Sequence, residues 1–264
     1  MTTEKPASPS TIPAEIPADL GSGLVSRLEQ VRSTLRQHLT PSPEGVCLTC
    51  SFQAEDVLLA RLALDLAPSL PILFLDTGYH FAETLAYRDQ LARDWRMNLI
   101  HLLPAQSVAD QERQHGLLHQ SAPDQCCKLR KVEPLFAALA SYRTWFTGLR
   151  REQARSRAAL EASAPFALPG GQTILKLAPL ADWSTRDVWY ACQQLAIPLL
   201  PLYAQGYTSI GCQPCTTLPL DPNDPRSGRW AGRKVECGIH IAAAPSPSAP
   251  SPSAPAPPEP NRAA

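Results

Sequence analysis

The chain has 264 residues, 44% hydrophobic and 18% charged, which is enough to bury one substantial core. Its 24 Lys and Arg residues balance 24 Asp and Glu residues, so net charge gives no general attraction to nucleic acid or to a membrane surface. The sequence has no apolar run of the roughly 20 residues that a membrane span needs, and no apolar signal-peptide core near its start. We therefore expect a cytoplasmic protein without nucleic-acid or membrane partners.

Both ends of the chain have compositions typical of disorder. Four prolines lie in the first 20 residues, and residues 243 to 264 read AAPSPSAPSPSAPAPPEPNRAA, with almost nothing apolar to bury. We expect a disordered tail over 1–20, one α/β domain over 21–230, a mobile segment over 231–242 and a second disordered tail over 243–264.

Short apolar runs alternate with helical patterns between these tails. Helices are predicted at 23–39, 54–67, 81–95, 106–114, 127–140 and 184–196, and strands at 45–52, 71–78, 97–103, 142–148 and 173–180. The alternation predicts a three-layer α/β domain with a mostly parallel sheet.

Polar loops follow three of the predicted strands. Ligands of parallel sheets bind at the carboxyl ends of strands, so the loops containing TCSFQAED, LDTG and TGLRREQ are expected to face one crevice. The first loop enters a helix whose free amides suit a phosphate, although Ser51 could equally be a helix cap. Four arginines in the third loop (Arg150, Arg151, Arg155 and Arg157) favour an anionic ligand, and a solvated helix face is the alternative.

The eight cysteines fall into different classes, and a reducing compartment argues against disulfides. Cys47 and Cys50, three apart on a strand, point to opposite faces and are expected in the core. Cys192 lies in an apolar helix and is also expected to pack. Cys237 is flanked by cationic residues in RKVECGIH, which favours a reactive thiolate; a stray thiol in a frayed terminus is the alternative.

Two cysteine pairs are candidate metal ligands. Cys126 and Cys127 are adjacent, while Cys212 and Cys215 form GCQPC in a loop where two thiolates can converge. Zinc and iron-sulfur centres both accept four thiolates. At a helix start, neighbouring side chains diverge by about 100°, so adjacent cysteines suit two irons of one cluster better than a single ion. The pattern therefore favours a 4Fe-4S cluster over zinc.

Seven motifs in this order resemble a known family: SFQAEDVLL, LDTGYHFAET, CCKLRKVEPL, TGLRREQARSR, GCQPC, DPRSGRWAGR and ECGIH. They are similar to the assimilatory adenylyl-sulfate reductases, iron-sulfur-containing relatives of the phosphoadenylyl-sulfate reductases within the adenine nucleotide α-hydrolase-like (modified PP-loop) fold. The resemblance spans almost the whole chain between the tails. One departure is Pro123, where many members have His before the cysteine pair.

The resemblance implies roles for individual residues. Cys237 would be the nucleophile, supported by Lys131 and His240, and the two cysteine pairs would bind one 4Fe-4S cluster per chain. The residues that would contact the substrate are Ser51, Phe52, Gln53, Leu75, Thr77, Gly78, Arg150, Arg157, Arg226 and Arg229.

The implied reaction is reduction of adenosine 5′-phosphosulfate to sulfite and AMP, for sulfate assimilation and cysteine biosynthesis. It would proceed through an enzyme S-sulfocysteine that thioredoxin or glutaredoxin resolves. Alternatives are a 3′-phosphoadenylyl-sulfate reductase or dual specificity and, more distantly, a PP-loop adenylating enzyme or a zinc-binding module without catalysis. A homo-oligomer is compatible with all of them.

Overall fold

The computed structural model describes residues 19–234 and 236–240, so the tails predicted to be disordered lie outside the described residues except for positions 19 and 20. The helices are α1 (Asp19–Leu39), α2 (Ala54–Leu64), α3 (Ala82–Asp94), α4 (Val108–His115), α5 (Leu118–Ser121), α6 (Pro123–Cys127), α7 (Glu133–Leu139) and α8 (Thr185–Gln194). The strands are β1 (Val46–Thr49), β2 (Pro71–Leu75), β3 (Asn98–Leu102), β4 (Thr144–Phe146), β5 (Ser163–Ala167) and β6 (Thr173–Leu177). None of the described helices is long and apolar enough to cross a membrane.

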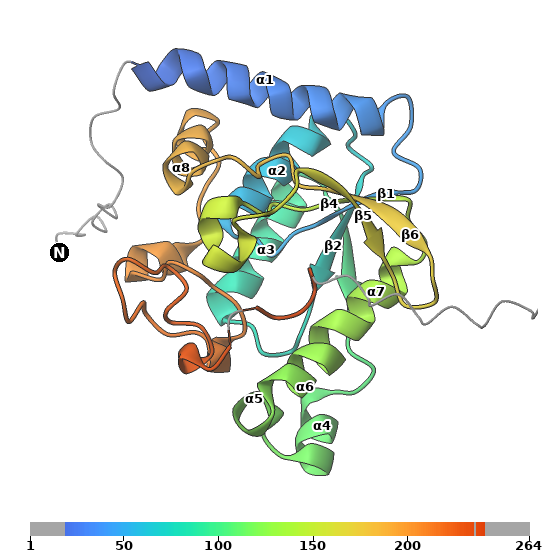
Figure 1. The fold of residues 1–264 in the computed structure, drawn as a ribbon, viewed down its shortest axis with the longest axis vertical. Helices are drawn as coiled ribbons and strands as arrows, with labels where there is room; N and C mark the ends of the chain where they lie inside the picture. The colour runs from blue at the N-terminus through green and yellow to red at the C-terminus, as the bar shows by residue number, and fades with distance from the viewer. Residues whose placement is uncertain (1–18, 235, 241–264) are drawn as a thin grey trace, which may run out of the picture.

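The strands form a single mixed sheet in the order β3-β2-β1-β4-β6-β5, parallel except for β5 at the edge (Figure 1). This confirms the predicted α/β class. The sequence pattern missed β5, because SAPFA has one large apolar residue, Phe166, and a proline, Pro165. An edge strand needs no two-sided apolar run and tolerates the missing amide of proline.

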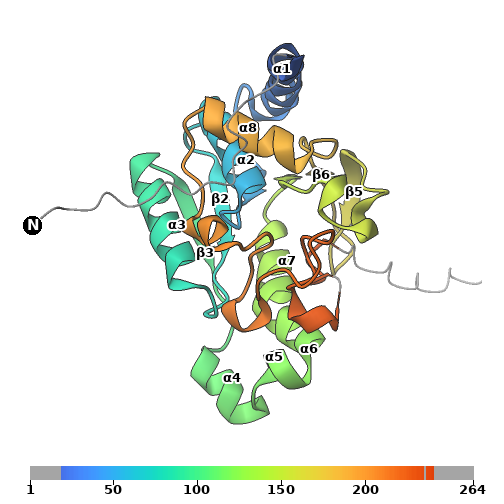
Figure 2. The same cartoon turned by 90° about the vertical axis from the view of Figure 1, so that its left-hand side faces the viewer.

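Side chains alternate between the two faces of the sheet along each strand, so they pack into two separate cores. Leu48 and Cys50 join the core on the α1, α2 and α8 side, whereas Cys47 and Trp145 join the core beneath α7. The two faces of the sheet are thus covered by helices, as the two views show (Figures 1 and 2). Cys47 and Cys50 lie on opposite faces and Cys192 is fully buried, as predicted.

The helix predicted at 127–140 begins earlier and is interrupted. It starts at Pro123 as α6, passes through a π-helical turn at Lys128–Val132 and continues as α7. Pro134 cannot donate to the carbonyl four residues before it, and a π turn accommodates such a break in the hydrogen-bond ladder. Cys126 and Cys127 therefore end a short helix instead of starting a long one.

The strand order reverses beside β1. After β1 the chain adds β2 and β3 on one side, then returns to place β4 on the other side of β1. A sheet of this kind has its crevice at such a switch point, outside the carboxyl ends of the strands.

Candidate functional site

A cavity of about 420 Å³ lies at the carboxyl ends of β1, β2 and β4. We call it the nucleotide cavity. Its lining includes residues from all three loops expected to face one crevice: Ser51, Gln53, Leu75, Thr77, Gly148 and Arg150. The same cavity contains Lys131, Arg157, Arg226, Arg229, Cys237 and His240. Most of the residues that the sequence singled out for substrate contact and catalysis are therefore brought together.

The loop after β1 is organised by Asp56, not by a capping serine. Ser51 donates to Asp56 Oδ2 from its backbone amide at 2.7 Å and from its hydroxyl at 2.5 Å. The N-cap position of α2 belongs to Gln53, whose side-chain oxygen accepts the amide of Ile210 at 2.8 Å. Ser51 thus lies near the start of α2 without capping it, and the loop is tied to a distant segment of the chain.

Two predicted substrate contacts lie off the nucleotide cavity. Phe52 is fully buried, with its ring edge-on to Phe74 and Tyr87, because its positive φ of 63° turns the side chain into the core. Gly78 is exposed and follows Thr77, which lines the cavity. A Cβ at Gly78 would meet Val108 Cγ2 at 2.7 Å, so close packing against α4 accounts for this glycine.

One wall of the cavity contains two carboxyl side chains, and the pKa of one of them, Asp56, is raised. Asp56 has its pKa raised to about 6 by burial and by the neighbouring Glu55 carboxylate, against the hydrogen bonds from Ser51. Glu55 accepts a hydrogen bond from Gln153 Nε2. One wall of the cavity is therefore acidic or neutral according to pH, opposite a basic wall.

The basic wall comes from distant segments. Arg229 is 6% exposed, and its Nη1 donates to Ser209 Oγ at 3.2 Å, while no partner is found for its buried Nε among the described residues. Gly211 lies against this guanidinium, since a Cβ there would overlap it. Two of the four arginines lie outside the cavity: Arg155 is exposed, which fits the solvated alternative, and Arg151 binds the Leu160 carbonyl and Asp182.

Arg150 lies in the cavity wall and bonds to the protein through both of its Nη atoms, while its buried Nε has no partner among the described residues. Its Nη1 donates to the carbonyl of Trp183 at 3.1 Å and its Nη2 to Thr185 Oγ1 at 3.1 Å. Glu152 lies 3.5 Å from the same guanidinium. Arg150 therefore joins the loop after β4 to α8, whatever it contributes to a ligand.

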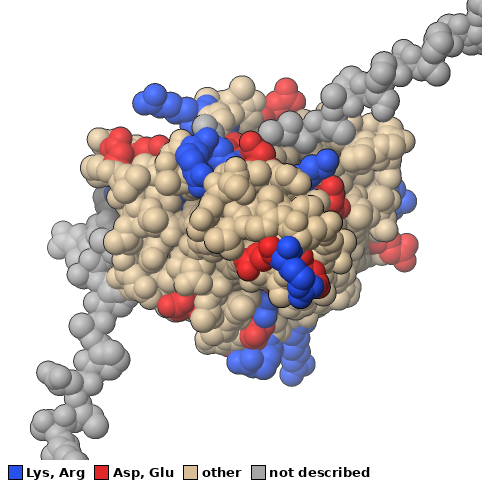
Figure 3. Space-filling model, turned by 90° about the horizontal axis from the view of Figure 1, so that it is seen from below, with Lys and Arg blue, Asp and Glu red and all other residues tan. Residues whose placement is uncertain are grey.

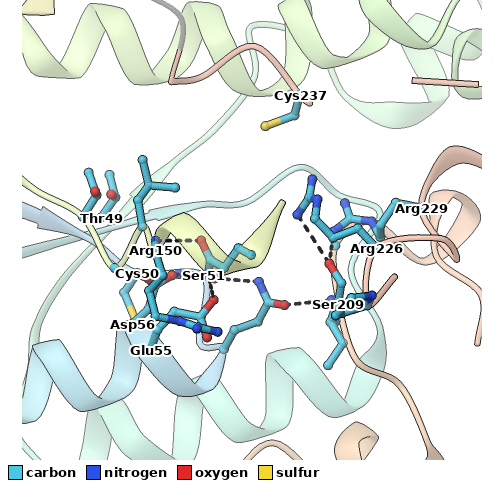
Figure 4. A pocket seen from close by; sticks show the side chains of 18 of the residues that line it. Thr49, Cys50, Ser51, Glu55, Asp56, Arg150, Ser209, Arg226, Arg229 and Cys237 are labelled. Atoms are coloured by element: carbon cyan, nitrogen blue, oxygen red, sulfur yellow. Dashed lines mark hydrogen bonds between the residues drawn. The ribbon is translucent and has the colours of Figure 1, made fainter. Parts of the chain in front are cut away.

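Cys237 faces the nucleotide cavity from the C-terminal segment. Figure 4 shows its sulfur across from Ser51 and Arg150 on one side and from Arg226 and Arg229 on the other. His240 stacks on Trp145, with centroids 5.5 Å apart, and its buried Nδ1 has no partner among the described residues. Burial and the nearby Lys176, Arg157 and Arg226 lower the pKa of His240, so the ring is neutral.

The two cysteine pairs line a second, smaller cavity, the cysteine cavity. Cys126 and Cys127 come from α6, and Cys212 and Cys215 from the loop around a short 3-10 turn. Within the described ranges no three His, Cys, Asp or Glu side chains are arranged to hold a single metal ion. Four thiols around one cavity fit a group whose several metal atoms each take one thiolate.

Cations border the cysteine cavity. Lys131 and Trp230 line both cavities, and Lys234 approaches Cys127. Burial raises the pKa of Cys127. Burial would also raise the pKa of Cys212, but Lys131, a hydrogen bond from Thr77 and Arg229 together hold it below its usual value. Positive side chains therefore offset thiolate charge where the two cavities meet.

Sequence reasoning missed several residues of the site, among them Asp56, Trp230 and Glu236. Glu236, immediately before Cys237, accepts hydrogen bonds from Arg157 Nε at 2.7 Å and Nη2 at 2.8 Å. The available signal was the acidic residue next to the nucleophile in ECGIH, close in the chain to basic motifs.

On the face shown in Figure 3, basic and acidic side chains are interspersed on a largely uncharged surface, so the basic cluster is a feature of the cavity and not of that face.

Solved structures with this fold include nucleotide enzymes. A phosphoadenylyl-sulfate reductase from Candida auris aligns with a TM-score of 0.61 and 24% identity, covering 77% of this chain and 98% of that one. An FMN adenylyltransferase from Candida glabrata aligns with a TM-score of 0.57 and 14% identity, covering 83% and 76%. These likenesses establish the adenine nucleotide α-hydrolase-like fold.

Sequence relatives are closer. The chain is 44% identical to the adenosine 5′-phosphosulfate reductase of Streptomyces coelicolor over 196 residues, 74% of this chain and 81% of the relative. It is 44% identical to that of Mesorhizobium japonicum over 202 residues, 75% and 77%, and 40% identical to that of Mycobacterium tuberculosis over 201 residues, 74% and 78%. The phosphoadenosine phosphosulfate reductase domain model matches residues 45–218. The chain therefore belongs to the phosphoadenosine phosphosulfate reductase family, among its adenosine 5′-phosphosulfate reductases.

Proposed function

We propose that this protein reduces adenosine 5′-phosphosulfate to sulfite and AMP in sulfate assimilation, with Cys237 as the nucleophile. The observation that carries this assignment is the meeting of the Cys237 thiol and several cations in a cavity at the carboxyl ends of parallel strands. Attack by a thiolate on an anionic substrate is opposed by charge repulsion. Lys131, Arg226 and Arg229, fixed in place before the substrate arrives, offset that repulsion.

The first half-reaction forms a sulfur–sulfur bond. The Cys237 thiolate attacks the substrate sulfur, and the bond from that sulfur to the bridging phosphate oxygen breaks, so that AMP leaves with the electron pair. The product on the enzyme is S-sulfocysteine. The loops containing Ser51 and Thr77 would hold the nucleotide while the basic wall holds the phosphate and sulfate oxygens.

The second half-reaction needs a dithiol. One thiolate of thioredoxin, or of a glutaredoxin, attacks the Cys237 sulfur and expels sulfite, and its second thiol resolves the mixed disulfide. The dithiol supplies two electrons and is left as a disulfide, and Cys237 returns as a thiol. Thioredoxin systems belong to reducing compartments, which supports a cytoplasmic location.

The cysteine cavity would hold a 4Fe-4S cluster through Cys126, Cys127, Cys212 and Cys215. Its chemistry when bound would be electrostatic, because the two thiol half-reactions already account for both electrons. Lys131 lines both cavities and is therefore the residue that would couple the charge of the cluster to the substrate anion. Trp230 lines both cavities as well and would exclude water between them.

Sulfite release measured with each sulfonucleotide in turn tests this function. Anaerobically purified enzyme with thioredoxin and its reductase should release sulfite from adenosine 5′-phosphosulfate, and far more slowly from the 3′-phosphorylated nucleotide. Equal turnover of both would point to dual specificity. Pyrophosphate release from ATP without sulfite from either nucleotide would indicate an adenylating enzyme, and bound zinc with no activity would indicate a binding module.

A further inference from the structure

We propose that Glu236 is a positioning residue, which clamps the C-terminal segment so that Cys237 is held over the nucleotide cavity. The proposal rests on the assigned role of Cys237 as nucleophile. Nothing in the chemistry of sulfonucleotide reduction requires a carboxylate at this place, next to an anionic substrate. Its position therefore needs a reason of its own.

The first support is the geometry of the carboxylate. Glu236 Oε1 accepts from Arg157 Nε at 2.7 Å and Oε2 from Arg157 Nη2 at 2.8 Å, a two-pronged pairing that fixes orientation as well as distance. Ser156 Oγ donates to Oε1 at 3.1 Å, and Arg226 Nη2 lies 3.5 Å from Oε2. Arg157 and Arg226 come from distant parts of the chain, so one carboxylate joins both of them to the segment.

The second support is another anchor on the far side of the nucleophile. The His240 ring stacks on Trp145, and its carbonyl accepts from Lys176 Nζ at 3.4 Å. Ile239 packs against the core beneath α7. Between the anchors, Gly238 has a φ of 91°, a left-handed turn that suits glycine. Cys237 therefore lies between an ionic anchor at Glu236 and an aromatic anchor at His240.

The third support is the strength expected of the ionic anchor. The side chains of Arg157, Arg226 and Glu236 are 13%, 15% and 19% exposed. Side chains this well shielded from water are screened little by salt, and a two-pronged pair between them keeps its geometry. A nucleophile that must be aligned with the substrate sulfur needs a hold of this kind.

A rival role would make Glu236 an internal competitor of the substrate, which occupies its arginines until the substrate displaces it. The clamp is favoured because Cys237 faces the cavity while Glu236 is paired, and because Lys131 and Arg229 lie in the same cavity outside the Glu236 contacts. The substrate anion therefore has cations of its own. If Glu236 is a clamp, removing its carboxylate should slow formation of the S-sulfo adduct. If it is a competitor, the same change should speed it.

The test uses anaerobically purified full-length holoenzyme and the variants Glu236→Gln and Glu236→Asp. Glu161→Gln, at an exposed carboxylate beyond Arg157, is the matched control. The readouts are the single-turnover rate of S-sulfo adduct formation at saturating adenosine 5′-phosphosulfate and the dissociation constant of AMP. We expect Glu236→Gln to slow the adduct step by about tenfold or more, as misplacement of a reacting group does, with AMP affinity unchanged or higher. Glu236→Asp should recover part of the rate.

A substrate-free readout separates positioning from loss of fold. Iodoacetamide should alkylate Cys237, which is half-buried in the parent enzyme, faster in Glu236→Gln than in the parent or in Glu161→Gln, because loss of the carboxylate releases the segment. An adduct rate unchanged in Glu236→Gln, or the same rate of Cys237 alkylation in Glu236→Gln and the parent, would overturn the clamp. A faster adduct step would overturn it in favour of the competitor. If the parent itself forms no adduct, the proposed function fails and not merely the clamp.

Discussion

The hydroxyl of Thr77 lies 3.3 Å from the sulfur of Cys212, so the loop after β2 touches both cavities. Thr77 is fully buried and lines the nucleotide cavity, while Cys212 lines the cysteine cavity. Any change in charge at Cys212 is therefore felt one side chain away from the nucleotide cavity. This contact joins residues 135 positions apart in the sequence and, with Lys131, links the two cavities.

Iron content tests the cluster directly. Anaerobically prepared protein should be brown, with iron and inorganic sulfide close to four each per chain, as a 4Fe-4S centre requires. Cys126→Ser should lose the cluster and destabilise its surroundings, since the remaining thiolates would lie together without compensating iron. Cys192→Ala should keep full iron content, because Cys192 lies in the core on the α1, α2 and α8 side, away from the cysteine cavity. Stoichiometric zinc without sulfide would contradict the assignment.

Truncation of the buried cations should weaken substrate capture. Lys131→Ala and Arg229→Ala should each cost about 2 to 4 kcal/mol of binding free energy, the range for removing one partner of a buried charge pair. Binding of adenosine 5′-phosphosulfate by titration calorimetry measures this. Arg155→Ala is the control, because Arg155 is exposed and outside the cavity. Unchanged affinity in both truncations would remove these residues from the site.

Cys237→Ser should abolish the covalent intermediate while leaving nucleotide binding intact, because a hydroxyl is a far weaker nucleophile than a thiolate. Intact-protein mass after mixing with adenosine 5′-phosphosulfate and no reductant is the measurement. The parent should gain one sulfite unit, about 80 Da, and thioredoxin should remove it. A mass gain in the serine variant would assign the nucleophile to another cysteine.

Gly211→Ala should displace Arg229. A Cβ at this position would overlap the buried guanidinium, which must then move or lose its contact with Ser209. We expect weaker nucleotide binding with a retained thermal transition. Gly23→Ala is a fitting control, since no atom lies within 4 Å of a Cβ there and alanine favours its helix. Normal affinity in Gly211→Ala would show that Arg229 does not bind the substrate in this position.

Asp56 makes stability depend on pH. Burial and Glu55 raise its pKa to about 6, from an ordinary value near 4, so between these pH values the folded state holds a proton that the unfolded state has lost. Stability contributed by this group is therefore lost as pH rises from about 4 to about 6. Asp56→Asn should remove that part of the pH dependence of urea unfolding, and Glu161→Gln should not. Identical pH profiles for Asp56→Asn and the parent would contradict the raised pKa.

Local chemistry was enough to predict the α/β class, the parallel strands and the three loops at one edge of the sheet, because apolar periodicity and turn residues are properties of short segments. The opposite directions of Cys47 and Cys50 followed from the period of a strand. Residue type and spacing also singled out the two cysteine pairs and Cys237, since thiols with such neighbours are chemically distinctive.

Only the tertiary structure decided which side chains share a cavity. Arg150 is committed to Trp183 and Thr185, Phe52 is turned into the core by its backbone, and Glu236 lies between two arginines. The edge strand β5 was likewise out of reach of periodicity. Each depends on which distant segment packs alongside, and the free energy of such contacts is set by burial and charge across the fold, which no local window of sequence contains.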